Sequence, residues 1–72
     1  MQSQPQRRSI GQRIADARKA QGLNQQQLAD RGHVSVSLLR KVEQGSRDAT
    51  AGLIAAIAKA LSVDTVVLTG QP

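Results

Sequence analysis

Apolar positions recur with a helical period over the first part of the chain. Ile10 and Ile14 are one helical turn apart, and the positions between them are mostly polar. This spacing is typical of a helix that packs one face against a core. Ser9 is suited to cap the start of such a helix and Gly22 to end it. We therefore expect a helix over residues 10–21.

The middle of the chain predicts two shorter helices joined by a tight turn. Asn24 is a good N-cap for the first, and Gln27, three residues later, completes a capping box. This helix is expected to end near Arg31–Gly32. The second is expected to run from its cap, Ser35, to Gln44.

The C-terminal part predicts a longer helix and one short turn. Thr50 can cap a helix over residues 51–61, which has a broad apolar face. Asp64 can cap a further turn through residues 66–68, although the β-branched side chains of Val66 and Val67 would also suit a strand. A single strand would have no partner in this chain, so the helix is the preferred interpretation.

These elements predict one all-α domain of five helices over residues 9–69. Residues 1–8 are polar and end in two arginines, so we expect them to form a disordered basic arm. Residues 70–72 are expected to be a tail. The polar ending resembles the start of a linker, which leaves open a further C-terminal domain or a partner protein.

Composition narrows the classes of function. The chain has 72 residues, with no aromatic residue and no cysteine, so the core must consist of Ala, Leu, Ile and Val. A domain this small is not expected to enclose a large catalytic cleft. No apolar run is long enough to span a membrane, and the N-terminus lacks the apolar core of a signal peptide. The absence of cysteine fits a reducing cytosol, and we expect a cytoplasmic, nucleoid-associated protein.

Charge points to a polyanionic partner. Ten Lys and Arg against five Asp and Glu give a formal net charge of +5. Such an excess favours nucleic acid or an acidic membrane surface as the partner.

The expected third helix has two chemically different sides. Val34, Leu39 and Val42 share one side, with Leu38 at its edge. The other side carries Val36, Ser37, Arg40, Lys41 and Gln44. A solvated face would explain this pattern on an arbitrary helix. A short capped helix and a tight turn come before it, however, and this order favours a helix that projects its polar side into a DNA groove.

The chain resembles the Cro and phage-repressor class of helix-turn-helix domains, also called the xenobiotic-response-element family. The similarity lies in I-G-x-R-I of the first helix, R-K-A-Q-G-L-N-Q-Q-Q-L-A at 18–29, V-S-V-S-L-L-R-K-V-E-Q-G at 34–45 and A-K-A-L-S-V at 58–63. It implies a compact lambda-repressor-like fold. It also implies sequence-specific binding to double-stranded DNA by a transcriptional regulator, repressor-like in its action and dimeric at least on DNA.

The resemblance assigns roles to individual residues. Those implied to contact base edges in the major groove are Val36, Ser37, Arg40 and Lys41. Those implied to contact DNA phosphates are Gln25, Ser35, Gln44 and Arg47. Arg18 and Glu43 match a pair that forms a structural salt bridge in this family.

The turn departs from the family pattern. The family usually has an apolar residue followed by glycine, and here these positions are Gly32 and His33. Two outcomes are open. His33 can adopt the left-handed conformation, which is less favourable for histidine than for glycine. Alternatively, Gly32 takes the left-handed backbone angles in a remodelled turn.

The sequence also leaves alternative functions open. The same fold could serve as a protein-interaction module, such as an antitoxin or an adaptor, with only weak or nonspecific nucleic-acid binding. A small basic protein could also bind RNA or membranes nonspecifically. His33 is the only histidine and there is no cysteine, so we expect no metal and no cofactor. Ser35, Ser37 and Asp30 near His33 fit helix caps better than a hydrolase triad, so no catalytic role is expected. The exposed part of Val66–Leu68, with the fourth helix, is the candidate dimer face.

Overall fold

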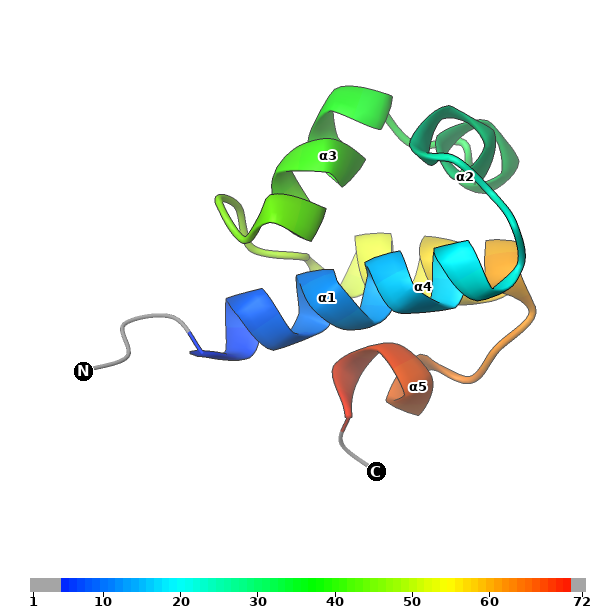
Figure 1. Ribbon diagram of the computed structural model, residues 1–72. Coiled ribbons are helices and arrows are strands. Elements are labelled where there is room, and N and C mark those ends of the chain that lie inside the picture. The colour runs from blue at the N-terminus through cyan, green and yellow to red at the C-terminus, as the bar shows by residue number, and fades with distance from the viewer. Residues whose placement is uncertain (1–4, 71–72) are drawn as a thin grey trace.

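The computed structural model describes residues 5–70, and side chains from Ile10 onward. Its described part is all-helical, as the sequence predicted, with five helices. The helices are α1 (Pro5–Ala20), α2 (Gln25–Gly32), α3 (Val36–Gln44), α4 (Ala51–Leu61) and α5 (Thr65–Thr69). In Figure 1, α1 crosses the middle of the molecule, with α2 and α3 on one side of it, α5 on the other and α4 behind.

The first helix begins earlier than predicted. It starts at Pro5, so residues 5–8, which the sequence analysis assigned to a disordered arm, are helical here, and Ser9 lies inside the helix rather than at its cap. Proline suits the first helical position because its fixed φ is already helical and its missing N–H would have no intrahelical partner. The remainder of the expected arm, residues 1–4, and part of the expected tail, residues 71–72, lie outside the described residues.

The other helix starts confirm the predicted caps. The side-chain oxygen of Asn24 accepts from the N–H of Gln27, and the Gln27 side chain accepts from the N–H of Asn24, which completes the capping box. Ser35, Thr50 and Asp64 each accept a backbone N–H at the start of α3, α4 and α5. These interactions are local, which is why the sequence alone could predict them.

One hydrophobic core holds the five helices together. Its fully buried large side chains come from every helix: Ile14, Leu28, Leu39, Val42, Ile57, Leu61 and Leu68. Leu68 explains why the last turn is a helix and not a strand. A five-residue helix brings this single side chain into the core and leaves Val66 and Val67 exposed.

The contact between α1 and α3 depends on a glycine. A methyl group at Gly11 would clash with the carbonyl oxygen of Val42 and would lie 3.2 Å from the Cα of Glu43. The side-chain-free surface at Gly11 therefore lets α3 approach α1 closely, and α1 is the platform that sets the position of α3.

Candidate nucleic-acid interface

The turn between α2 and α3 keeps a left-handed residue at its second position. His33 has φ 56° and ψ 43°, and the N–H of Val34 donates to the carbonyl of Ala29 at 3.0 Å. Of the two outcomes left open by the sequence, His33 rather than Gly32 takes the special angle. The His33 side chain is exposed, so it can adopt this conformation without disturbing the packing of α2.

The reversed order of the two residues leaves space behind the turn. A methyl group at Gly32 would lie 3.6 Å from the carbonyl oxygen of Ala56 and 3.6 Å from the Cβ of Ala60, which is ordinary contact. An apolar side chain at this position would therefore face α4. The glycine here is not required by the packing.

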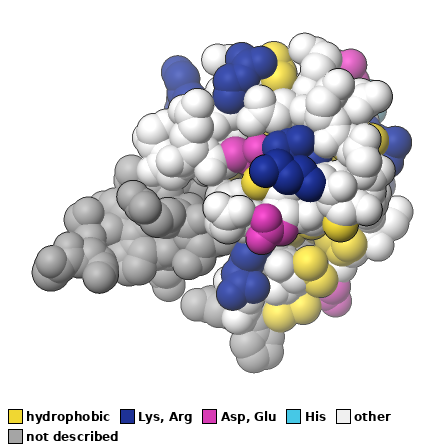
Figure 2. Space-filling view, in the orientation of Figure 1, with side chains coloured by type: hydrophobic (Ala, Val, Ile, Leu, Met, Phe, Trp, Pro, Cys, Tyr) yellow, Lys and Arg dark blue, Asp and Glu magenta, His cyan; other side chains and the backbone are white. Residues whose placement is uncertain are grey.

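α3 is fixed to the core on one side only. Leu39 and Val42 are buried beneath it, and Val36 and Leu38 are half-buried at its edges. The side chains of Ser37, Arg40, Lys41 and Gln44 are exposed. Figure 2 shows the molecule in the orientation of Figure 1, with basic side chains in the region of α3 and hydrophobic side chains gathered further down, near α5. The polar side of α3 is thus both rigidly supported and accessible.

Both ends of α3 are stabilised by local hydrogen bonds. The Ser35 hydroxyl oxygen accepts from the N–H of Leu38 at 3.2 Å, so Ser35 serves as the N-cap while its hydroxyl faces solvent. At the other end Gly45 is left-handed with φ 79°, and the Ser46 hydroxyl donates to the carbonyl of Lys41 at 3.1 Å. The exposed Arg47 follows in the loop, two residues beyond Gly45.

An ion pair joins α1 to α3 at the predicted positions. Arg18 Nε donates to Glu43 Oε2 and Arg18 Nη2 donates to Glu43 Oε1, each at 2.9 Å. The two side chains are only 10% and 6% exposed. Arg18 Nη1 also donates to the carbonyl of Leu23 at 2.8 Å, so the guanidinium holds the α1–α2 connection as well. Among the described residues, no buried side-chain nitrogen or oxygen lacks a hydrogen-bond partner.

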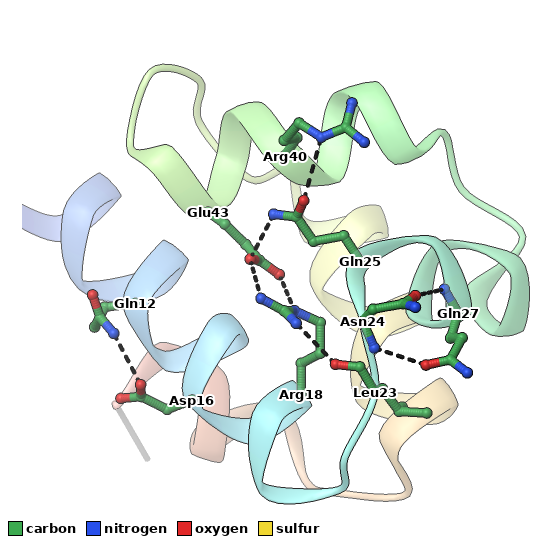
Figure 3. Close-up of polar contacts among 9 residues, drawn as sticks. All are labelled: Gln12, Asp16, Arg18, Leu23, Asn24, Gln25, Gln27, Arg40 and Glu43. Atoms are coloured by element: carbon green, nitrogen blue, oxygen red, sulfur yellow. Dashed lines mark hydrogen bonds and ion pairs between the residues drawn. The ribbon is translucent and has the colours of Figure 1, made fainter.

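The structure places Gln25 in a role that the sequence analysis missed. Its side-chain amide donates to Glu43 Oε1 at 3.0 Å and its carbonyl oxygen accepts from Arg40 Nε at 3.3 Å (Figure 3). The first residue of α2 therefore bridges the ion pair and the exposed arginine of α3. The sequence did carry a signal for this contact. Arg40 and Glu43 are three positions apart on one helix, so their side chains lie on the same face and can contact the same neighbouring residue.

Comparison with known proteins decides the family. A family model described as helix-turn-helix, HTH_3, matches residues 14–68, most of the chain. The chain belongs to the Cro/C1-type helix-turn-helix family. Members of this family are DNA-binding transcription regulators, so the polar side of α3 belongs to a DNA-binding domain.

A solved structure supports the same conclusion. The chain is similar to the crystal structure of C.AhdI, a restriction-modification controller protein from Aeromonas hydrophila. The two chains are 32% identical with a TM-score of 0.83, and the match covers 86% of this chain and 94% of C.AhdI. No sequence among curated proteins matches this chain.

Two further features of the described residues bear on the interface. None of the helices in residues 5–70 is long and apolar enough to cross a membrane. Within the same range, no group of three or more His, Cys, Asp or Glu side chains is placed to hold a metal ion.

Proposed function

We propose that this protein binds double-stranded DNA at specific sequences and regulates transcription from it, as a repressor does. α3 enters the major groove and α2 lies across the sugar-phosphate backbone. The observation that carries the proposal is the exposed polar and basic side of α3, held by Leu39 and Val42 on a buried core. The similarity to a controller protein supports a regulatory outcome of binding.

The base contacts follow from side-chain chemistry. Arg40 can donate two parallel hydrogen bonds to guanine O6 and N7, and Ser37 can donate to or accept from a base edge. Val36 offers a methyl surface to a thymine methyl, and its half-buried position keeps it at the border between groove and core. Lys41, one residue beyond Arg40, reaches a base or the adjacent backbone.

The phosphate contacts surround this reading face. Gln25 is the first residue of α2, where unpaired backbone N–H groups of a helix N-terminus favour a phosphate. Its side-chain amide uses one hydrogen on Glu43, and a second amide hydrogen remains to donate. Ser35, Gln44 and Arg47 are exposed at the two ends of α3 and in the loop beyond it. These positions fix the register of the domain on the duplex without reading sequence.

Specific binding at physiological salt is proposed to require two copies of the chain. A single module of this size offers a small contact area, whereas two modules related by a dyad read two half-sites about 34 Å apart, one turn of DNA. The candidate dimer face is formed by Val66 and Val67 of α5, which are 37% and 45% exposed. Val67 borders an open depression that Arg13, Asp16 and Ala17 also line.

The protein is proposed to lie in the cytoplasm at the nucleoid and to have no catalytic role. The test of the proposed function is selection of bound duplexes from a random library, followed by salt titration of the enriched and the unselected pools. We expect an enriched pseudo-palindrome whose half-sites lie one helical turn apart. Equal affinity for both pools, with the same steep salt dependence, would instead show nonspecific electrostatic binding. No binding even at low salt would favour a protein-interaction module.

A further inference from the structure

Gln25 connects two charged residues of α3 in a fixed direction. A side-chain amide has a donor end and an acceptor end. Here the donor end meets the Glu43 carboxylate and the acceptor end meets the Arg40 guanidinium (Figure 3). Rotating the amide by half a turn would place a carbonyl against a carboxylate and an amino group against a cation. Only one orientation satisfies both neighbours.

The Glu43 end of this connection is rigid. Arg18 holds both carboxylate oxygens, and both side chains are almost fully buried. Hydrogen bonds to an ionised group are the stronger kind. Gln25 is therefore anchored on an acceptor that cannot move without breaking the contact between α1 and α3.

The Arg40 end leaves the base-reading atoms free. Arg40 uses its Nε to reach Gln25, at 3.3 Å, and this is the hydrogen bond that the structure gives its side chain. The two terminal nitrogens remain, and these form the fork that pairs with guanine O6 and N7. An exposed arginine otherwise samples many rotamers, and ordering it on DNA opposes binding.

We propose that Gln25 is a positioning residue for Arg40, and that it sets how strongly the protein discriminates at the base that Arg40 reads. Gln25 holds the guanidinium in the groove-facing orientation before DNA arrives. This role is separate from any phosphate contact of the same side chain, and it rests on the function proposed above.

The two roles have different signatures. A residue that only holds a phosphate weakens binding to all sequences by a common factor. A residue that acts through Arg40 reduces discrimination at one base position, and its effect disappears once Arg40 is gone. Non-additivity between the two substitutions therefore identifies the positioning role.

The experiment uses the full chain with Gln25→Met, Arg40→Ala and the double variant. Methionine keeps the length of glutamine but loses the amide donor and acceptor. The matched control is Gln26→Met, because Gln26 is the next residue of α2 and its amide donates to Asp30 of the same helix at 2.9 Å. Thermal unfolding checks that each variant is folded. If Gln25→Met unfolds, Gln25→Asn carries the same readout, since its shorter side chain cannot span Glu43 and Arg40.

The probes are a duplex with the site selected by the wild-type chain and the three duplexes with another base pair at the position that Arg40→Ala relaxes. We expect Gln25→Met to reduce discrimination there by roughly threefold to tenfold, the worth of one hydrogen bond. Gln26→Met should leave the discrimination unchanged, and the double variant should discriminate among the four duplexes as Arg40→Ala alone does.

Two results would overturn the inference, and they are distinguishable. If Gln25→Met weakens binding to all four duplexes equally and adds to Arg40→Ala, Gln25 is a phosphate contact and does not position Arg40. If the wild-type chain selects no site, the proposed function itself fails and the inference falls with it.

Discussion

Arg18 and Glu43 are 25 residues apart in the chain and form a two-point ion pair, with both N–O distances 2.9 Å. The pair lies between α1 and α3, and both side chains are almost completely buried. It therefore ties the helix proposed to read DNA to the helix on which the core is built.

Arg18→Ala is expected to destabilise the fold strongly. It leaves the Glu43 carboxylate buried without a counter-charge and removes the bond to the Leu23 carbonyl. Losing one partner of a buried pair costs about 3–5 kcal/mol. Thermal unfolding followed by circular dichroism measures the loss. The exposed neighbour Lys19, changed to alanine, is the control and should melt close to the wild type. An unchanged melting temperature for Arg18→Ala would show that the pair does not stabilise the domain.

Arg40→Ala is expected to leave stability nearly unchanged and to alter DNA recognition. Its side chain is exposed, and among the described residues its one hydrogen bond is to the side chain of Gln25. Loss of a base contact costs about 1–3 kcal/mol and relaxes preference at one position. Binding to the selected duplex and its single-base variants measures both effects. A uniform loss across all duplexes would place Arg40 on a phosphate instead.

The same substitution at two glycines is expected to have opposite effects. Gly11→Ala forces α1 and α3 apart, because the added methyl meets the backbone of Val42 and Glu43. Overpacking of this kind costs about 1–3 kcal/mol. Gly32→Ala adds a methyl in ordinary contact with α4 and reduces the freedom of the unfolded chain, so it should stabilise by about 0.5–1 kcal/mol.

Chemical denaturation of the two alanine variants measures this contrast. Gly32→Ala also serves as the control for Gly11→Ala, because both place a methyl on a helix. Equal effects at the two positions would mean that the close approach at Gly11 has no energetic weight.

His33→Gly is expected to stabilise the turn. His33 is a non-glycine residue at φ 56°, a conformation that costs an L-residue about 1–2 kcal/mol. Glycine removes this strain but has a more flexible unfolded state, so the net gain should be about 0.5–1 kcal/mol. Ser62, at φ 58°, provides a second position where glycine should act in the same direction. His33→Ala keeps the strain and should give no gain. A loss of stability in both glycine variants would contradict the account.

The sequence predicted those parts of the fold that depend on neighbours along the chain. The caps at Asn24, Ser35 and Thr50 and the end of α3 at Gln44 involve residues within one turn, and each was found where predicted. The start of α1 was predicted wrongly because Ser9 was read as a cap, whereas Pro5 can begin a helix on its own.

The site was less accessible to sequence reasoning because its geometry depends on distances between helices. The pairing of Arg18 with Glu43 came from a family resemblance and not from spacing. The bridge made by Gln25 and the close approach at Gly11 require the actual separation of α1, α2 and α3. Periodicity predicts which face of a helix is buried, but it does not predict which residue of another helix that face contacts.

The measurement that tests the central claim most directly replaces purine N7 atoms in the selected duplex. Substituting 7-deazaguanine or 7-deazaadenine, one position at a time, removes an acceptor from the major groove and leaves base pairing and the minor groove intact. If α3 reads the major groove, a few positions in each half-site should weaken wild-type binding, and the one read by Arg40 should have no effect on Arg40→Ala. Unchanged wild-type affinity at every position would contradict the claim that α3 reads the major groove through purine N7.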